Sequence, residues 1–419
     1  MTDPSLLVVA DDLTGATDTA HEFAARGYRA VVVQDSTAEA DSAEVLAVNA
    51  DTRTAPPEAA SAVVSDAIER HPADLVFKKL DSTMRGNVVA EVDAAVEASR
   101  TDLAVLTPAA PDHGRIVAGG HLLVDGSPVD GSESSDRESP LRTSELTGVL
   151  SESRYPVARV ALSTVARGPT AVRERLGRIA GNHGTAIAVC DATTGAHIDA
   201  VAVGADRIDA SVVYAGSSGL AEYVCLPTHG RERRILGVVG STNERTIDQL
   251  TALSDDRIVA LDVAAALAEP ATAGRDAADR YLDVVADGGA CVVASARTSG
   301  DVAAAYRRGN EQQGLDRSAV RDRIRAALVA AVDRVWERSP PDGLFVTGGS
   351  VATAVFDSLG VERVALTGRS VAAGVPVVRL DADRADSVPA VTKAGGFGAT
   401  GAIRRTLAAL EREASFRSE

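Results

Sequence analysis

Short apolar runs alternate with amphipathic helical segments along most of this chain of 419 residues. The run Leu6–Ala10, for example, leads into a helical pattern from Thr14 to Arg26. In the first half of the chain, strands are predicted at residues 6–10, 30–34, 44–50, 74–79, 102–109, 158–162, 186–192 and 211–216. Parallel strands need a crossover connection, which is usually a helix, so the alternation predicts a parallel sheet covered by helices.

A linker-like segment, LPTHGRERR at residues 226–234, divides the alternating pattern into two series. Proline, glycine and a run of charges are typical of a domain boundary. A chain of this length is long enough to form two domains, each with its own hydrophobic core. The second series of predicted strands occupies residues 235–241, 257–263, 290–296, 343–350, 375–380 and 389–396. We therefore expect an α/β fold of two domains with mainly parallel sheets, residues 1–228 and 229–419, and an active-site cleft between the domains.

The charge balance and the lack of long apolar runs exclude two classes of partner. The net charge is −16 at pH 7, which argues against a nucleic-acid partner held by phosphate neutralisation. No apolar run reaches the roughly 18 residues of a membrane helix, and the first residues, MTDPSLLVVADD, lack the features of a secretory signal. We expect a cytoplasmic protein with small-molecule ligands, no nucleic-acid or membrane partner, and the homodimeric state that is commonest among oligomers.

Only three of the 43 basic residues are lysine, and these fall in two short segments. Lys78 and Lys79 lie in FKKLDSTMRGN, and Lys393 lies in VTKAGGFGATG. Lysine is a compact point charge and a common phosphate ligand, so both segments are candidate ligand sites, although codon usage alone would also make lysine rare. Lys79 and Lys393 are the candidate site residues, and Lys78, a neighbour of Lys79 on a strand, is expected to point the other way.

Two aspartates, Asp11 and Asp12, follow the first predicted strand directly. Ligands of open α/β sheets bind at the carboxyl ends of the strands, where these side chains would meet a sugar hydroxyl or a metal ion. The alternative is that both aspartates cap the helix that begins near Thr14. Because adjacent side chains point in different directions, one of them can face a ligand while the other caps the helix.

The segment KKLDSTMRGN concentrates polar groups after another predicted strand. Arg85 offers a bidentate fork for a carboxylate, Asp81 can accept hydrogen bonds from hydroxyls, and Asn87 is a further candidate. The alternative is a solvated, charged turn. After the next strand, Arg115 and His113 could add donors, although the histidines of this region lack the spacing of a zinc site.

Strand–glycine/serine–helix junctions occur at residues 214–224, 238–250 and 345–359. Each one places backbone N–H groups and hydroxyls at a helix N-terminus, which is a natural cradle for an anion. Two of the junctions lie in the second predicted domain together with KAGGFG, which favours a nucleotide polyphosphate. GFGATG (396–401) fits G-x-G-x-x-G, but no βαβ unit follows it, and neither a P-loop nor a protein-kinase motif is present.

These segments, in this order, resemble the four-carbon acid sugar kinase family over nearly the whole chain. The resemblance rests on ADDLTGATD, KKLDSTMRGNVVAEV, PAAPDHGR, GGHLLVDGSPV, GSSGLAE, VVGS, VTGGS and VTKAGGFG. It implies an N-terminal domain that binds an acid sugar and a C-terminal domain that binds a nucleotide, both α/β. It also implies ATP-dependent phosphorylation of a terminal hydroxyl of an acid such as erythronate, threonate or 3-oxo-tetronate.

The resemblance also implies which residues bind each substrate. The acid would meet Asp11, Asp12, Lys79, Asp81, Arg85, Asn87 and Arg115. ATP would meet Ser241, Gly348, Gly349, Ser350, Val351, Lys393, Gly395 and Gly396. The chain departs from the family pattern in the nucleotide half: Ser350 stands where an acidic residue is usual, and Asn243 where a second serine is frequent. These departures concern contacts to the metal or the ribose.

From these residues we expect a kinase that uses ATP and Mg²⁺. Arg85 with Lys79 would bind the substrate carboxylate, and Asp12 would orient the reacting hydroxyl or take its proton. Two alternatives remain open at this point. One is a non-catalytic sensor of a sugar acid and a nucleotide, which Ser350 favours, and the other is an NAD-dependent sugar-acid dehydrogenase, which GFGATG suggests.

Overall fold

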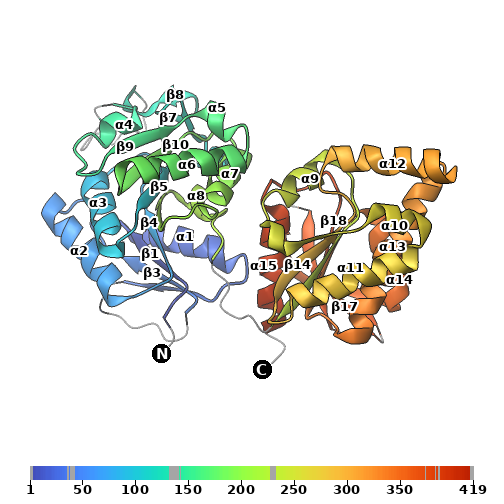
Figure 1. Cartoon of the computed structure of the whole chain (residues 1–419). Helices are drawn as coiled ribbons and strands as arrows, with labels where there is room; N and C mark the ends of the chain where they lie inside the picture. Colours follow the sequence, from blue (N-terminus) through green and yellow to red (C-terminus); the bar gives the residue numbers. More distant parts are fainter. Residues whose placement is uncertain are drawn as a thin grey trace. The chain divides into compact units, whose positions relative to one another are not determined.

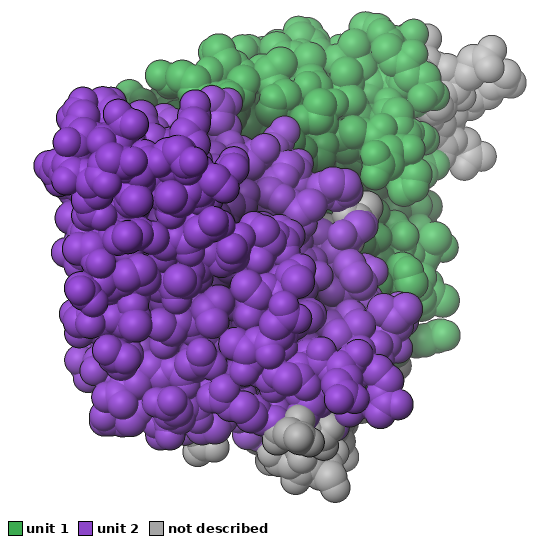
Figure 2. All heavy atoms as spheres, turned by 90° about the vertical axis from the view of Figure 1, so that its right-hand side faces the viewer, with its two compact units in different colours: residues 1–227 green, residues 228–419 purple. Residues whose placement is uncertain are grey.

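The chain forms two compact units, residues 1–227 and 228–419 (Figure 2). The structure, a computed structural model, describes residues 3–34, 37, 43–131, 141, 143–226, 233–372, 374–382, 384–385 and 387–415. Residues 227–232, most of the predicted linker, lie outside the described residues. Each unit is a mostly parallel sheet with flanking helices, so the predicted fold of two α/β domains with mainly parallel sheets is confirmed.

Unit 1 is built on an eight-stranded sheet in which every pairing is parallel. In sheet order its strands are β2 (Ala30–Val33), β3 (Val45–Asn49), β1 (Leu6–Ala10), β4 (Leu75–Lys79), β11 (Val212–Gly216), β5 (Leu103–Thr107), β10 (Ala186–Cys190) and β9 (Val157–Val160). The central strands are buried along most of their length because helices cover both faces of the sheet, and they are mainly apolar, with Lys78 and Lys79 at the end of β4 as the exceptions. Ala10 pairs with Asn49 on one side and Lys79 on the other, so β1, β3 and β4 end together.

The helices of unit 1 cover opposite faces of this sheet. They are α1 (Leu13–Ala24), α2 (Pro57–Arg70), α3 (Val88–Ser99), α4 (Leu146–Val149), α5 (Leu162–Val165), α6 (Pro169–His183), α7 (Gly195–Ala205) and α8 (Ser218–Ala221). From β1 the chain crosses to β2, and from β3 it crosses in the opposite direction to β4. Right-handed crossovers therefore put α1 on one face, with α2 and α3 packed together on the other (Figure 1). Because the crossovers reverse their direction here, a crevice is expected at the carboxyl ends of β3, β1 and β4.

A small antiparallel sheet in unit 1 was not predicted from the sequence. Its strands are β6 (Arg115–Ala118), β7 (His121–Val124) and β8 (Ser127–Pro128). They are two to four residues long and carry no sustained alternation of apolar and polar residues. A two-residue turn, Gly119–Gly120, with positive φ at both glycines joins the first two strands. The sheet carries Arg115 on a hairpin instead of an open loop.

Unit 2 contains a seven-stranded sheet with a parallel part and an antiparallel edge. In sheet order its strands are β13 (Ile258–Ala260), β14 (Gly289–Ala294), β12 (Arg234–Val239), β15 (Gly343–Thr347), β18 (Pro389–Lys393), β17 (Val375–Ala382) and β16 (Val361–Ala372). β17 runs antiparallel to both β18 and β16. The edge strand β16 was missed because its register is irregular and it exposes apolar side chains such as Leu366, which is 77% exposed.

The helices of unit 2 also divide between the two faces of their sheet. They are α9 (Glu244–Leu250), α10 (Val263–Ala268), α11 (Pro270–Val284), α12 (Ser299–Gln313), α13 (Arg317–Arg338), α14 (Gly349–Leu359) and α15 (Ala402–Ser415). α11, α13 and α14 pack on one face, and α15 packs with α9 on the other (Figure 1). The helices that follow β12 and β18 therefore pack on one face of the sheet, and the helix that follows β15 packs on the other face. A second crevice is expected at the ends of these three strands.

The 22-residue α13 carries charged side chains along its length. Among the described residues, no helix combines the length and the apolar character that a bilayer span requires.

Candidate active site

A cluster of charged side chains lies at the carboxyl ends of β1, β3 and β4. Asp11 and Asp12 follow β1, Arg53 follows β3, and Asp81 follows β4. The guanidinium of Arg53 joins them, with Nε 2.7 Å from Asp11 Oδ2 and Nη1 2.8 Å from Asp12 Oδ2. Arg53 Nη2 also lies 3.6 Å from Asp81 Oδ2. The aspartates predicted from two separate segments are therefore brought together, because their strands are neighbours that end at one edge.

Arg53 itself was missed by the sequence reasoning. It lies four residues after β3, and its backbone N–H, like that of Thr52, donates to the carbonyl of Asp11. The signal that could have identified it is an arginine just beyond the carboxyl end of a predicted strand. That signal gains weight only when β3 is known to lie beside β1, which the order of strands along the chain does not reveal.

Asp12 caps α1 and also belongs to the cluster. Its Oδ1 accepts a hydrogen bond of 2.7 Å from the backbone N–H of Gly15, while its Oδ2 pairs with Arg53. The alternative that both aspartates cap the helix therefore holds for Asp12 alone, and its side chain remains in the cluster with 29% of it exposed. Asp11 is buried, and its Oδ1 finds no hydrogen-bond donor among the described residues. A buried acceptor of this kind is a position at which a ligand donor would be stabilised.

Asp81 and Arg85 form a bidentate pair within one turn of chain. Arg85 Nη2 lies 2.7 Å from Asp81 Oδ2, and Arg85 Nε donates to Oδ1 at 3.1 Å. Burial would raise the pKa of Asp81, but hydrogen bonds from Arg85 and Thr83 and the charge of Arg85 hold it well below its usual range. The Arg85 guanidinium, which the sequence predicts to bind a substrate carboxylate, therefore contacts Asp81 in this structure. The Arg85 side chain remains 36% exposed.

Lys79 lies beneath this cluster as a buried cation. Its Nζ donates to the carbonyl of Leu80 at 2.8 Å. Burial lowers the pKa of Lys79, and the nearby charges of Asp11 and Asp81 oppose that effect. A Cβ at Gly15 would come within 3.0 Å of Lys79 Nζ, so a glycine in the first turn of α1 gives the ammonium its space.

Lys78 and Asn87 shape the loop that carries Arg53. Lys78 is fully buried and pairs with Glu91 of α3 at 2.8 Å, which confirms that it points away from Lys79. Glu91 in turn accepts a hydrogen bond from the hydroxyl of Thr52. The side-chain amide of Asn87 donates to the carbonyls of Thr52 and Ala55, at 2.8 Å each. In this structure both side chains brace residues 52–55 and act on the cluster through that loop.

Arg115 lies apart from these contacts. It begins the hairpin strand β6, and its Nη1 donates to the carbonyl of His113. Its Nε is buried without an acceptor among the described residues. The ion pairs described above do not include Arg115, so its predicted place among the acid-binding residues remains a prediction.

In unit 2, the loops after β12, β15 and β18 converge on Ser241. A Cβ at Gly348, whose φ is +102°, would come within 3.2 Å of the Ser241 backbone nitrogen. A Cβ at Gly395 would lie only 2.2 Å from Ser241 Oγ. Thr246 joins the same loops, because its hydroxyl lies 3.2 Å from Ser241 Oγ and donates to the carbonyl of Gly395 at 2.9 Å. Three segments far apart in the sequence thus approach closely where only glycine leaves room.

The N-terminus of α14 lies directly beside Ser241, where these loops meet. The helix begins at Gly349, its N-cap is Gly348, and no side chain caps it. Ser350 and Val351 occupy its first turn, and Ser350 is exposed. The uncapped backbone N–H groups and the helix dipole favour negative charge at this end. Of the residues predicted to bind ATP, those of 348–351 are therefore grouped around one uncapped helix N-terminus.

Lys393, the last residue of β18, is the buried cation of unit 2. Its Nζ donates to the carbonyls of Ala394 at 3.0 Å and Phe397 at 3.2 Å. Burial, together with the charge of Arg245, lowers the pKa of Lys393 to about 8. Across the described part of the chain, no carboxylate forms an ion pair with this ammonium. Gly396, which follows this segment, remains a predicted ATP residue.

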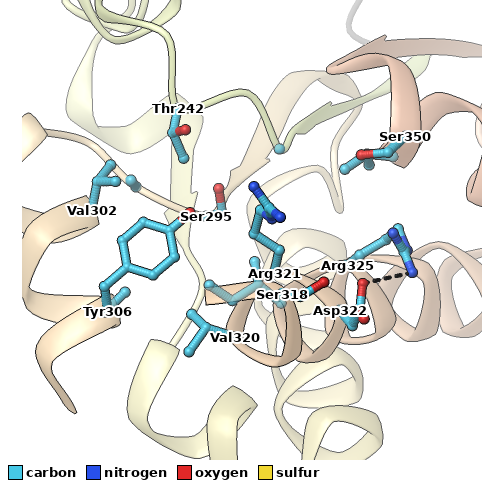
Figure 3. A pocket seen from close by; sticks show the side chains of 15 residues that line it. Thr242, Ser295, Val302, Tyr306, Ser318, Val320, Arg321, Asp322, Arg325 and Ser350 are labelled. Carbon is cyan, nitrogen blue, oxygen red and sulfur yellow. Dashed lines mark ion pairs between the residues drawn. The ribbon is translucent and has the colours of Figure 1, made fainter. Parts of the chain in front are cut away.

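A pocket of about 370 Å³ adjoins these loops in unit 2 (Figure 3). Its lining includes Gly240, Thr242, Ser295, Tyr306, Arg321 and Ser350. Most of its wall comes from α12 and α13, which the sequence reasoning did not connect with a ligand. No motif marks these helices, and their place beside β12 and β15 is a property of the tertiary fold.

Within the residue ranges that the structure describes, no group of three or more His, Cys, Asp or Glu side chains could hold a metal ion. Hydroxyl oxygens such as Ser241 Oγ are present at the convergent loops of unit 2. Mg²⁺ commonly keeps several waters and binds substrate phosphates, so these loops are compatible with a nucleotide-borne ion.

The sequence and the fold were compared with known proteins. A family described as a sugar-binding N-terminal domain matches residues 6–224, and one described as a nucleotide-binding C-terminal domain matches residues 236–403. A D-threonate kinase of Salmonella typhimurium is 31% identical over 94% of this chain and 95% of its own length. A D-erythronate kinase of Heliobacterium modesticaldum is 30% identical over 94% of each chain. A 3-oxo-tetronate kinase of Methylobacterium radiotolerans is 30% identical over 95% of this chain and 97% of its own.

One solved structure is similar over almost its full length. It is a Bordetella bronchiseptica protein described as a domain of unknown function, solved with bound citrate as a domain-swapped dimer. The two chains are 28% identical with a TM-score of 0.62, and the match covers 98% of this chain and 99% of the other. The similarity therefore extends over both units.

Proposed function

This chain belongs to the four-carbon acid sugar kinase family, and we propose that it transfers the γ-phosphoryl group of ATP to the terminal O4 hydroxyl of a four-carbon sugar acid such as erythronate, threonate or 3-oxo-tetronate. The observation that carries the proposal is the pair of dissimilar sites. Unit 1 has a cluster of carboxylates and cations, and unit 2 has a glycine-rich anion cradle with a buried lysine. The Salmonella, Heliobacterium and Methylobacterium relatives, each named as a kinase of such an acid, support the same reaction.

The acid is proposed to bind at the carboxyl ends of β1, β3 and β4. Arg85, whose guanidinium is partly exposed beside Asp81, and Lys79 supply the positive charge for its carboxylate. Asp11, through its unpaired buried oxygen, and Asp81 accept hydrogen bonds from hydroxyls. The Bordetella relative was solved with citrate, which is itself an anionic hydroxy acid. Asn87 acts through the 52–55 loop, and Arg115 joins this set from the start of the hairpin strand β6.

Asp12 is proposed to orient the reacting hydroxyl and to receive its proton. It is the partly exposed aspartate of the pair after β1, and its cap on α1 holds the carboxylate in a fixed direction. As the bond from O4 to the γ-phosphorus forms, the bond to the bridging oxygen of ADP breaks. The O4 proton passes to Asp12, and the negative charge on the transferred group stays with its oxygens.

The phosphates of ATP are proposed to bind at the convergent loops of unit 2. Backbone N–H groups near Ser241 and at Gly348–Gly349 cradle the oxygens, and Lys393 adds a positive charge. Ser350, Val351, Gly395 and Gly396 complete the set, and Gly395 leaves room for Ser241 Oγ among these loops. The hydroxyl oxygen of Ser241 would be available to an Mg²⁺ ion carried by ATP, which would supply positive charge to the phosphates.

The proposal is tested by measuring ADP release over a panel of four- and five-carbon sugar acids, with ATP and Mg²⁺. We expect turnover with at least one four-carbon acid. Arg85→Ala should raise KM for that acid at least roughly tenfold, because a hydrogen bond to a charged group contributes about 1.5–3 kcal/mol, while binding of ADP stays unchanged. Tight binding of both ligands without turnover would instead support the sensor. Binding of NAD with no ATP-dependent turnover would support the dehydrogenase.

A homodimer is the oligomeric state that we propose for this chain. The support is the related Bordetella protein, which was solved as a domain-swapped dimer. Light scattering after size-exclusion chromatography should give about twice the chain mass of 43.1 kDa. A value equal to the chain mass at all concentrations would exclude it.

A further inference from the structure

The pocket of about 370 Å³ in unit 2 has a size and position that the phosphate-binding loops do not explain by themselves. It extends from Gly240 and Thr242 after β12 to the space between α12 and α13. Pockets of roughly 300–1,000 Å³ commonly hold small-molecule ligands. Because one end of the pocket is formed by the loops proposed to hold phosphates, a ligand bound to those loops would extend into it.

Tyr306 supplies an aromatic wall to this pocket. Its ring lies on α12, beside the aliphatic side chains of Val302 and Val320 (Figure 3). The guanidinium of Arg317 lies over the ring, 4.4 Å from the centroid. This cation–π contact restricts the ring and occupies one of its faces, so the other face remains for a flat ligand group. A restrained ring loses little entropy when such a group stacks on it.

Ser295 supplies an unsatisfied polar group. It follows β14, is 6% exposed, and lines the pocket with its side chain (Figure 3). Within the described ranges, its Oγ has no hydrogen-bond partner. A buried hydroxyl without a partner is rare in a folded protein because its desolvation is uncompensated. A ligand hydroxyl or ring nitrogen in the pocket would supply the missing hydrogen bond.

The two arginines of α13 in the pocket differ in how their charges are compensated. Arg325 pairs with Asp322 at 2.9 Å. Arg321 is exposed, points into the pocket in Figure 3, and forms no ion pair among the described residues. The pocket therefore combines an aromatic and aliphatic wall, a buried hydroxyl and an uncompensated cation. This combination suits a flat heterocycle joined to a polar, anionic group.

We propose that this pocket binds the nucleoside part of ATP, with the base stacked on the free face of Tyr306 and a ribose hydroxyl or base nitrogen bonded to Ser295 Oγ. Arg321 attracts the polyphosphate as it passes towards the loops at Thr242 and Ser350. The inference rests on the proposed function, because it assigns the remainder of the nucleotide whose phosphates that function places on the same unit. It adds Tyr306, Ser295 and Arg321 to the residues that bind ATP.

The test compares ADP with inorganic tripolyphosphate, which carries phosphates but no nucleoside. Calorimetric titration of the full chain should show that Tyr306→Ala weakens ADP binding roughly 10- to 100-fold, the range measured for base stacking on aromatic side chains. Tyr306→Phe, which keeps the stacking face, should remain within about threefold of wild type, and Ser295→Ala should weaken ADP several-fold. Tripolyphosphate should bind equally to all of these proteins, which also shows that the variants are folded.

Tyr155→Ala is the matched control, because it removes a half-buried tyrosine of unit 1. Its affinity for ADP should equal that of wild type. If wild type binds ADP and Tyr306→Ala binds it equally well, the nucleoside site is overturned while the kinase proposal stands. Equal losses of ADP and tripolyphosphate in Tyr306→Ala would also overturn it. If wild type binds no nucleotide at all, the proposed function itself fails.

Discussion

The two proposed ligand sites use opposite electrostatic designs. In unit 1, three aspartates after β1 and β4 are matched by Arg53, Arg85 and Lys79, so the charges are compensated before any ligand arrives. In unit 2, Lys393 is buried among backbone carbonyls and glycines without a carboxylate partner in the described residues. The first site is suited to orienting a small molecule that has both hydroxyls and a charge. The second holds uncompensated positive charge that a polyphosphate would neutralise.

This difference also predicts in which unit a charged residue that binds ligand lowers the stability of the fold. Compensated ion pairs hold the loops of unit 1 together, so breaking them exposes unpaired buried charges. A buried ammonium without a counter-charge destabilises the folded state, so removing it should stabilise the protein at the expense of ligand binding. The following predictions test the contrast.

The largest expected effect is on turnover in Asp12→Asn. Asparagine keeps the cap on α1, because it is as good an N-cap as aspartate, but it cannot take a proton. We expect kcat to fall at least roughly 100-fold, the lower range for loss of a general base, with the Kd of ADP unchanged. Asp51→Asn is the control, since Asp51 is exposed in the neighbouring loop and its φ of +50° suits asparagine. A kcat within threefold of wild type for Asp12→Asn would remove Asp12 from the reaction.

The second effect is a pair of stability changes of opposite sign. Arg53→Met should destabilise unit 1 by about 2–4 kcal/mol, because it leaves the buried Asp11 without its cation. Lys393→Met should stabilise unit 2 by about 1 kcal/mol, because it removes an uncompensated buried charge. Scanning calorimetry at pH 7 measures both as shifts of Tm. Shifts of the same sign in the two variants would contradict the electrostatic contrast.

A third effect is the pH dependence of nucleotide binding. The pKa of Lys393 is about 8, below its ordinary value, so the ammonium is charged at pH 7 and loses its proton as pH rises through 8. Affinity for ADP should therefore fall by about tenfold between pH 7 and pH 9. Lys393→Arg should remove this dependence, because arginine stays protonated throughout. A wild-type affinity that is constant over this range would show that the Lys393 charge does not contact the phosphates.

The smallest effect concerns acid stability in unit 1. The folded-state pKa of Asp81 lies well below the unfolded value, so its ion pair stabilises the fold above about pH 4 and is lost progressively as pH falls below that value. The difference in unfolding free energy between wild type and Asp81→Asn should therefore be larger at pH 7 than at pH 3, by about 1 kcal/mol. Urea titrations at the two pH values measure it. An equal difference at both values would mean that the Asp81 charge does not stabilise the fold.

Some of the fold and some of the site could be predicted because their signals are local. The buried strand β1 is an apolar run and β4 begins with one, Leu75–Phe77, and a parallel strand buried on both faces favours such residues. Asp11, Asp12 and Asp81 lie within two residues of the ends of these strands, so their position at the carboxyl edge follows from the strand assignment alone. The opposite directions of Lys78 and Lys79 follow from the two-residue period of a strand.

Other features could not be predicted because they depend on which distant segments become neighbours. Arg53 enters the cluster only because β3 lies beside β1, and the fork of Arg85 is directed to Asp81 by the turn between them. The wall of Tyr306 and Arg321 requires α12 and α13 to pack beside the ends of β12 and β15. Neither helix carries a pattern that distinguishes it from an ordinary surface helix.

The sequence by itself determined the α/β class, the apolar strands and the polar residues that end them, because each depends on a few consecutive side chains. The tertiary structure alone decided the strand order, the charge compensation around Arg53 and the pocket beside Tyr306. The physical reason is that the pattern of buried and exposed side chains in a strand or helix depends on residues that are close in the sequence. The pairing of charges and the formation of a pocket depend instead on the order of the strands in each sheet. In that order β1 lies between β3 and β4, and β15 lies between β12 and β18.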